Sequence, residues 1–140
     1  MSEKNPKESF GIRKVSMSTI PAFVLLELGL ALQEGAAKYG RHNYRSVGNI
    51  KSSVYYDSVF RHLMAWWEGE DEDPDSGLSH ITKAIASLVV LRDAMMQDNH
   101  LDDRPPKSSP EWMNEFNAAA TKLCEKYPNP VKPHTQMDID

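Results

Sequence analysis

The sequence predicts an all-α protein of about four helices. Apolar residues recur at helical spacing in four segments, breaker-rich polar stretches separate these segments, and none alternates as a half-buried strand does. With 140 residues, 40% of them apolar and 26% charged, the composition is that of one globular domain. We therefore expect a helical bundle over residues 1–127 and a flexible, proline-rich tail over residues 128–140.

The first two helices are marked by their apolar positions and by glycines at their ends. The first lies within residues 18–40, where Ser/Thr and an early proline precede the apolar run and Gly40 follows it. The second runs from about Ser53 to Trp67 and carries a broad apolar stripe before Gly69. A polar loop joins them.

The last two helices are marked by caps. Asp75 or Ser76 caps the third, which carries apolar residues toward a core and fades near Gln97. The fourth lies within residues 108–127, with a serine cap, a proline at its first position and an amphipathic pattern. Short amphipathic helices need partners for their apolar faces, and this chain has more large aromatic residues than one small bundle hides. We therefore predict a homo-oligomer, either a dimer or a tetramer.

Charge and composition limit the partners. The formal net charge is −4, without the broad basic surface that nucleic-acid binding requires, so no nucleic acid is expected. The N-terminus has no apolar core of a secretory signal, and no stretch reaches membrane-spanning length. The single cysteine, Cys124, fits a reducing compartment. We expect a cytoplasmic protein without a membrane partner.

The stretch GEDEDPDSGLSH, residues 69–80, is a candidate metal site. Hard cations such as Mg²⁺ and Mn²⁺ prefer oxygen ligands, usually a few carboxylates with water and substrate phosphate. Glu70 and Asp73 are spaced to converge on one ion if the second helix continues for another turn. Asp71 and Glu72 are better explained as solvated loop residues.

Polar residues on the flanking helices support this hypothesis. Asp57, Arg61 and His62 form a polar band along the second helix. On the third helix, His80 begins a stripe of small or polar residues that either leaves room for a ligand or allows close helix packing. Two histidines facing a carboxylate turn across a helical hairpin favour a functional site.

A third group follows the first helix in EGAAKYGRHNYR, residues 34–45. Lys38, Arg41 and Arg45 are anion partners, Asn43 is an amide donor, and two tyrosines can stack on a base. The helix dipole alone explains Lys38. It does not explain donors and aromatic rings at this density, which suit the phosphates and base of a nucleotide.

These motifs resemble a known family. GAAKYGRHNYR followed by RHLMAWWEGEDEDPDSGLSHITKA, within residues 21–94, is similar to the phage-associated dATP/dGTP diphosphohydrolases, the MazZ-type enzymes related to the MazG all-α nucleoside triphosphate pyrophosphohydrolases. The chain departs from the common MazG signature of Glu-x-x-Glu and Glu-x-x-Asp on successive helices, because it has Asp57 on the second helix and Glu70-x-x-Asp73 near the turn. Tyr44 replaces a frequent tryptophan of the family.

The resemblance implies metal-dependent hydrolysis of a purine deoxynucleoside triphosphate, dGTP or dATP, to the monophosphate and pyrophosphate. Mg²⁺ or Mn²⁺ would neutralise the triphosphate and activate water. The expected metal ligands are Glu70 and Asp73, with Asp57, Glu34 and His80 completing or orienting the cluster. The phosphates are expected to bind at Lys38, Arg45 and Arg61, and the sugar or base at Asn43 and Tyr39. His62 is expected to orient or deprotonate the attacking water. We expect Glu34 near the opposite end of the helical hairpin from Glu70, so that it joins the site only through altered packing or a second subunit.

Two alternatives remain from the residues. A phosphohydrolase that releases triphosphate typically has an adjacent His-Asp pair, which this chain lacks. A non-enzymatic helical adaptor would explain the aromatic residues, but it leaves the carboxylate turn and the KYGRHNYR segment without a role.

Overall fold

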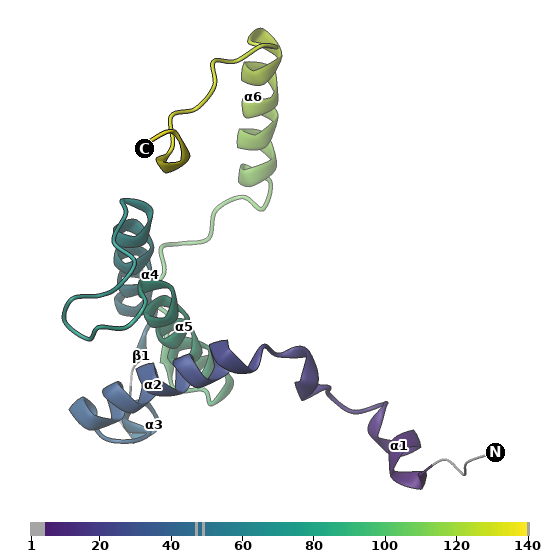
Figure 1. Cartoon of the computed structure of the whole chain (residues 1–140), viewed down its shortest axis with the longest axis vertical. Helices are drawn as coiled ribbons and strands as arrows, with labels where there is room; N and C mark the ends of the chain where they lie inside the picture. Colours follow the sequence, from purple (N-terminus) through teal and green to yellow (C-terminus); the bar gives the residue numbers. More distant parts are fainter. Residues whose placement is uncertain (1–4, 47, 49, 140) are drawn as a thin grey trace. The chain divides into compact units, whose positions relative to one another are not determined.

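The computed structural model of the chain describes residues 5–46, 48 and 50–139. The elements within residues 1–104 are α1 (Pro6–Gly11), η1 (Met17–Thr19), α2 (Ala22–Tyr39), α3 (Asn43–Ser46), β1 (Ile50–Lys51), α4 (Ser52–Trp67), α5 (His80–Met96) and β2 (His100–Leu101), followed by α6 (Trp112–Lys126) and η2 (Gln136–Asp138) (Figure 1). The described residues are mostly helical, which confirms the predicted class. The four long helices are those that the sequence pattern predicted.

The chain divides into two units, residues 1–104 and residues 105–140. In the second unit, α6 and η2 contain no buried residue among those described. The division at Arg104 falls before the end of the predicted 1–127 domain, and that domain and the 128–140 tail stay predictions. No helix in the described part of the chain is long and apolar enough to cross a membrane.

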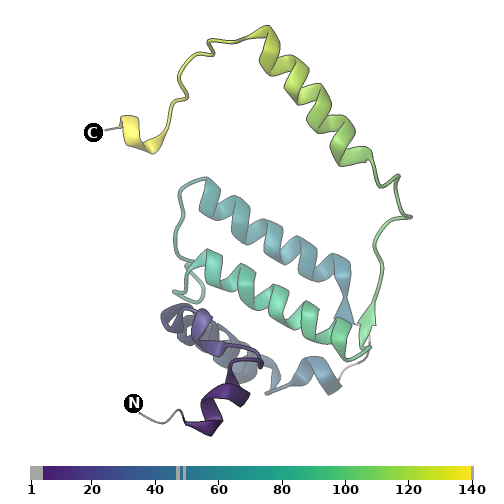
Figure 2. The same ribbon diagram turned by 90° about the vertical axis from the view of Figure 1, so that its right-hand side faces the viewer.

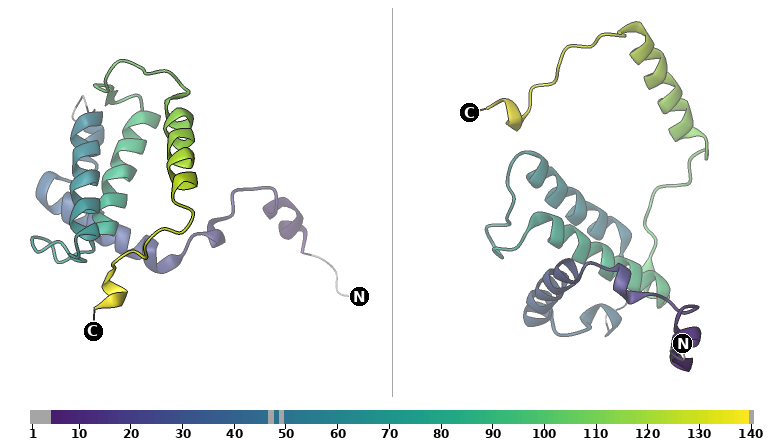
Figure 3. Two further views of the ribbon diagram at one scale, coloured as in Figure 1. Left: turned by 90° about the horizontal axis from the view of Figure 1, so that it is seen from above. Right: turned by 45° about the vertical axis from the view of Figure 1, so that its right-hand side comes forward.

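Helix α5 is the centre of the first unit. It packs against α4 along one side and against α2 along another (Figure 2). Helices α4 and α5 are antiparallel, because Ser58 contacts Ser87 while His62, further along α4, contacts His80 at the start of α5. The right-hand view of Figure 3 shows α5 lying between α4 and α2. The α4–α5 pair therefore matches the predicted hairpin, and α2 packs on α5.

Small residues make the contact between α4 and α5 close. Ala84 is buried, and the hydroxyl groups of Ser58 and Ser87 are 3.2 Å apart. Of the two roles that the sequence left open for the small-residue stripe on α5, the structure shows close packing. The remaining buried apolar residues are Ala31, Ile50 and Ala94, and no large side chain is fully buried in the described residues.

The third helix begins later than predicted. Its N-cap is Ser79, whose hydroxyl accepts hydrogen bonds from the backbone N–H groups of Ile81 and Thr82, and not Asp75 or Ser76. Residues 73–78 cannot join the helix, because Asp73 N–H donates to the carbonyl of Leu78 and closes a tight turn. Gly77 has φ of 73° in this turn, a conformation that favours glycine.

A two-stranded parallel sheet joins the two ends of the α4–α5 hairpin, because β1 directly precedes α4 and β2 follows α5. Ile50 of β1 pairs with His100 of β2, and each strand is only two residues long. Ser52 contacts the His100 ring, and the Asp103 carboxylate accepts a 2.8 Å hydrogen bond from Ser53 N–H at the start of α4. Periodicity did not predict these strands, because two residues are too few to show alternation.

Candidate functional site

Three predicted site residues meet where α4 and α5 come together beside the acidic turn. The Nε2 atom of His80 lies 2.7 Å from Oε1 of Glu70, and its Nδ1 atom lies 2.9 Å from Nδ1 of His62. The His80 side chain is 6% exposed, whereas that of Glu70 is 53% exposed. The contacts therefore form a chain that leads from a solvent-facing carboxylate into the helix interface.

The turn holds Glu70 in place through its backbone. Helix α4 ends at Trp67, and Gly69, with φ of 106°, reverses the chain so that Glu70 N–H donates to the carbonyl of Ala65. His80 N–H in turn donates to the carbonyl of Asp71. The helix does not continue beyond Trp67, so Glu70 and Asp73 do not lie on one helical turn. The reason first given for their convergence therefore does not hold, although both stay in the same loop.

With both imidazoles neutral and Glu70 ionised, the contacts fit one pair of tautomers. A carboxylate only accepts hydrogen bonds, so the Glu70 contact places the His80 proton on Nε2. The Nδ1 atom of neutral His80 then carries a lone pair and must accept from Nδ1–H of His62. This leaves Nε2 of His62 without a proton. Burial, and then the neighbouring His80, lowers the pKa of His62, which keeps that ring neutral near pH 7. His62 is therefore a candidate proton acceptor.

Helix α2 brings a second group of charges to the same end of α5. The Glu34 carboxylate lies 2.7 Å from the Lys83 ammonium and 3.2 Å from that of Lys38. Lys38 also lies 3.4 Å from the carboxylate of Asp75 in the acidic turn. The hydrogen bond from Lys83 is the main cause that lowers the pKa of Glu34. The structure shows a packing of the kind that the prediction allowed for Glu34: α2 packs on α5, and Glu34 contacts Lys83, one turn beyond His80 on that helix.

Two members of this group were not predicted from the sequence. Lys83 pairs with Glu34, and Glu27 of α2 accepts a hydrogen bond from the hydroxyl of buried Thr82. The signal was present in the spacing: Glu27, buried Ala31 and Glu34 follow one another at four and three residues, which places them on one face of α2. That face is the one that packs on α5.

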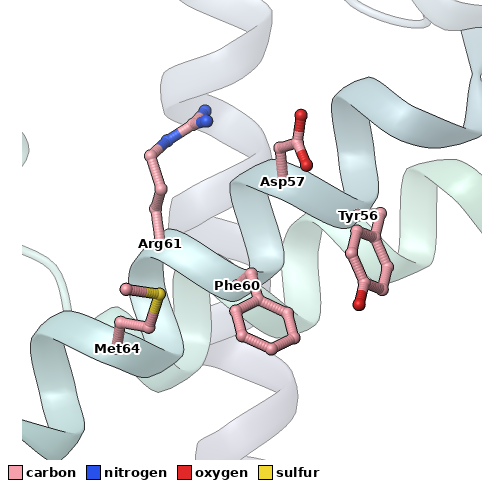
Figure 4. A pocket seen from close by; sticks show the side chains of 5 residues that line it. All are labelled: Tyr56, Asp57, Phe60, Arg61 and Met64. Atoms are coloured by element: carbon pink, nitrogen blue, oxygen red, sulfur yellow. The ribbon is translucent and has the colours of Figure 1, made fainter.

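Asp57 and Arg61 lie apart from this cluster. Both line a shallow hollow of about 280 Å³ on the exposed side of α4, with Tyr56, Phe60 and Met64 (Figure 4). His62, the next residue after Arg61, turns instead toward α5 and His80. The polar band expected along α4 is thus divided between two sides of the helix.

Residues of the KYGRHNYR segment are also divided. Lys38 lies at the acidic turn, but the Arg45 guanidinium donates two hydrogen bonds, of 3.1 and 2.8 Å, to Asp93 near the other end of α5. His80 and Asp93 are separated by about 20 Å along the helix axis. Tyr39 is exposed, and Asn43 begins α3. Arg45 therefore does not join the cluster around Glu70.

The fit of a divalent cation depends on what completes its coordination. In the described ranges, no three His, Cys, Asp or Glu side chains are grouped so as to hold a metal ion. Both ring nitrogens of His80 are already hydrogen-bonded. Mg²⁺, however, is commonly held by one or two carboxylates together with substrate phosphates and water. Glu70, half exposed and with one oxygen directed to His80, suits a cation that arrives with a triphosphate.

The fold and this cluster together define an all-α protein that gathers carboxylates, imidazoles and ammonium groups at one end of its central helix. Such a set suits hydrolysis of a phosphate anhydride. The family described as dATP/dGTP diphosphohydrolase, N-terminal, matches residues 4–104, which is over two thirds of the chain. The chain belongs to this family, and the predicted resemblance is confirmed. No curated protein and no solved structure matches the chain.

Proposed function

We propose that this protein hydrolyses purine deoxynucleoside triphosphates, dGTP first and dATP second, to the monophosphate and pyrophosphate. Membership of the dATP/dGTP diphosphohydrolase family over residues 4–104 is the observation that carries this proposal. The cluster of Glu70, His80 and His62 beside Lys38 and Lys83 supports it, because it combines a neutral base with cations for phosphate. We also propose a role in remodelling the nucleotide pool of a phage-infected cell, in line with the resemblance to phage-associated enzymes.

In the proposed reaction, a water molecule attacks the α-phosphorus and the bond to the bridging α–β oxygen breaks. Nε2 of His62 accepts the proton of that water, while His80 and Glu70 hold the ring in the required tautomer. The electron pair leaves with pyrophosphate, whose charge Lys38 and Lys83 neutralise. Both lysines contact Glu34 in the structure, so the nucleotide competes with Glu34 for them.

We propose Mg²⁺ or Mn²⁺ as the cofactor, with Glu70 and Asp73 as its carboxylates and the triphosphate oxygens as its remaining ligands. When bound, the cation supplies charge neutralisation and a lower pKa for water. Tyr39 and Asn43, which follow Lys38 closely in the chain, are proposed for the base and sugar. We assign no phosphate-binding role to Arg45, because its Nε and one terminal nitrogen donate to Asp93.

The test is a panel of ribo- and deoxyribonucleoside triphosphates, incubated with Mg²⁺ or Mn²⁺, with chromatographic identification of every product. Reaction in ¹⁸O-labelled water should place the label in the nucleoside monophosphate, and excess EDTA should abolish turnover. Release of triphosphate with free nucleoside would indicate the other phosphohydrolase chemistry. No product from any nucleotide, together with no thermal shift on adding dGTP and Mn²⁺, would favour the adaptor.

The protein is also proposed to act as a homo-oligomer, a dimer or a tetramer. Phe23, Leu26 and Leu30 of α2 are exposed at helical spacing, and large apolar side chains of α4 are exposed as well. Contiguous apolar surface of this kind usually marks an interface. Light scattering of the purified chain at micromolar concentration tests the oligomeric state, and a stable monomer would count against it.

A further inference from the structure

Two lysines from different helices share one carboxylate oxygen beside the acidic turn. Nζ of Lys83, in the first turns of α5, lies 2.7 Å from Oε1 of Glu34, and Nζ of Lys38, near the end of α2, lies 3.2 Å from the same atom. Lys38 also lies 3.4 Å from Oδ2 of Asp75. We call Lys38 and Lys83 the lysine pair. Cations and anions therefore alternate from α5 through α2 to the acidic turn.

The contact at Glu34 is more than a single ion pair. One cation is enough to neutralise a carboxylate, and a second ammonium group at the same oxygen brings two like charges close together. The side chains of Glu34 and Lys83 are only 22% and 19% exposed, so water and salt screen these charges less than they do at an open surface. The lysine pair therefore requires an anion between its members.

The position of the lysine pair suits the anion of a phosphate. Lys83 lies near the N-terminal end of α5, where the helix dipole favours negative charge. Its charge also acts on His62: burial and then His80 are the largest causes that lower the pKa of His62, and Lys83 lowers it further. A phosphate oxygen between the two ammonium groups would take the place of the Glu34 oxygen and lie near the proposed base.

We propose that Glu34 is an internal competitor for the phosphate site: in the free protein its carboxylate occupies the position between Lys38 and Lys83 that an oligophosphate takes on binding. Binding is then an exchange of anions, in which the carboxylate leaves both ammonium groups and a phosphate oxygen replaces it. The inference rests on the proposed function, which assigns phosphates to the same lysines. It adds that Glu34 sets how tightly those phosphates are held.

The exchange preserves the link between two helices. Glu34 of α2 now contacts Lys83 of α5, and this ion pair helps to hold the helices together. A phosphate oxygen between Lys38 of α2 and Lys83 of α5 would connect the same helices. Oligophosphate binding therefore replaces the contact that it breaks.

Pyrophosphate becomes a ligand in its own right under this proposal. The lysine pair recognises phosphate oxygens and no part of a nucleoside, so free pyrophosphate should bind without a divalent cation. Glu34 weakens this binding, because its two ion pairs must be broken first. The same competition favours release of pyrophosphate after the proposed hydrolysis.

The experiment is isothermal titration calorimetry of the 140-residue chain with inorganic pyrophosphate in metal-free buffer. Glu34→Gln keeps the size of the side chain and an oxygen for the lysines but removes the charge, so the dissociation constant should fall by about tenfold. Lys83→Met removes one cation and should raise it by about tenfold.

Glu27→Gln is the matched control. It makes the same change in net charge on the same face of α2, but Glu27 accepts a hydrogen bond from Thr82 and contacts neither lysine in the structure. Its dissociation constant should stay within about twofold of wild type. If Glu34→Gln fails to fold, Glu34→Asp replaces it: the shorter side chain keeps the charge but reaches the lysines less well, and it should bind pyrophosphate about threefold more tightly.

Thermal melting gives a second measurement. Removal of the Glu34 charge should lower the melting temperature in the absence of ligand, and saturating pyrophosphate should raise it by more in Glu34→Gln than in wild type. A purely structural Glu34 would lower the melting temperature without changing the affinity for pyrophosphate, and that result would overturn the proposal.

Two further results would overturn the proposal: equal strengthening of binding in Glu27→Gln, which would assign the effect to net charge, or no binding of millimolar pyrophosphate by any of these proteins. Neither measurement involves turnover. Hydrolysis of dGTP together with unchanged pyrophosphate affinity in Glu34→Gln would refute only the competitor role. Tighter binding in Glu34→Gln without hydrolysis of any nucleotide would refute only the proposed function.

Discussion

The two sides of α4 differ in how their side chains are accommodated: one side pairs buried polar groups, and the other exposes apolar ones. Toward α5, His62 meets His80, and the histidine at the centre of the contact is 6% exposed with a partner on each ring nitrogen. On the side away from α5, Phe60 and Trp67 are exposed, and Asp57 and Arg61 form no ion pair or side-chain hydrogen bond among the described residues. Buried polar groups must be paired within the chain, because an unpaired one costs about 1–3 kcal/mol. Exposed apolar groups need no such partner, and they can stay in contact with water or be covered by a second molecule.

The largest effect is expected on catalytic turnover when Glu70, at the α4–α5 contact, is replaced. Glu70→Ala removes the acceptor that holds the His80 tautomer and a proposed metal carboxylate, so turnover should fall by a factor of about 10² to 10⁴. Steady-state kinetics with dGTP measures it. Glu72→Ala, in the same loop, is the matched control and should keep activity within a few-fold. Full activity of Glu70→Ala would show that the cluster is not the active site.

Replacing His80 tests how much the inner contact stabilises the fold. His80→Ala leaves Glu70 and the partly buried His62 without a partner and opens a small cavity, so the free energy of unfolding should fall by about 2–4 kcal/mol. Urea denaturation measures this loss. Ser87→Ala, further along α5, removes one neutral hydroxyl contact and should cost about 1 kcal/mol or less. Equal losses for both variants would mean that the histidine contact stabilises the fold no more than a single neutral hydroxyl contact does.

As the pH falls, the contact between His62 and His80 should lose its contribution to stability before the other described contacts of the site do. Burial lowers the pKa of His62 below its ordinary 6.5, so the unfolded chain binds the proton more readily than the folded one. The stabilisation is present above pH 6.5 and is lost as the pH falls below it toward the folded pKa. Protonation would also set N–H against N–H at the His80 contact.

The pH effect is measured by thermal melting between pH 8 and 4. A separate loss is expected at lower pH, because Lys83 lowers the pKa of Glu34 below its ordinary 4.5. His62→Gln should remove the first step, whereas Lys83→Met should remove the second. A flat profile between pH 7 and 5 in the wild type would contradict the assignment for His62.

The smallest effect is expected at Arg45. Its ion pair with Asp93 is more than half exposed on the arginine side, so Arg45→Met should leave the midpoint of urea denaturation nearly unchanged. Because its donors are committed to Asp93, KM for dGTP should change by about twofold or less. A tenfold rise in KM would instead restore Arg45 to the phosphate site that the sequence predicted.

The sequence predicted the helices better than it predicted their contacts. The spans of α2, α4 and α5 follow from apolar periodicity and from glycines at their ends, which are local properties. The start of α5 was placed too early, because Asp75 and Ser76 also look like caps until the turn closed by Asp73 and Leu78 is seen. The two-residue strands are made by residues fifty positions apart and leave no local pattern.

The site residues show the same difference between local pattern and long-range packing. His62, His80 and Glu70 were predicted from a motif within nineteen residues, and the α4–α5 hairpin brings them together because a short loop fixes which faces meet. The sequence left open whether packing brings Glu34 to the site, and it gave no sign of Glu27 and Lys83, because all three contacts depend on how α2 lies on α5. Asp57 was grouped with His62 by spacing, although the two lie on different sides of α4.

By itself, the sequence determined the all-α class, the long helices and the family, since these depend on residue periodicity and on a contiguous motif. Only the tertiary structure decided which carboxylate meets which cation, which ring nitrogens of the two histidines face each other, and which side of α4 packs on α5. The physical reason is that helical periodicity places a side chain on one face of its own helix, whereas the neighbour of that face depends on how the helices pack.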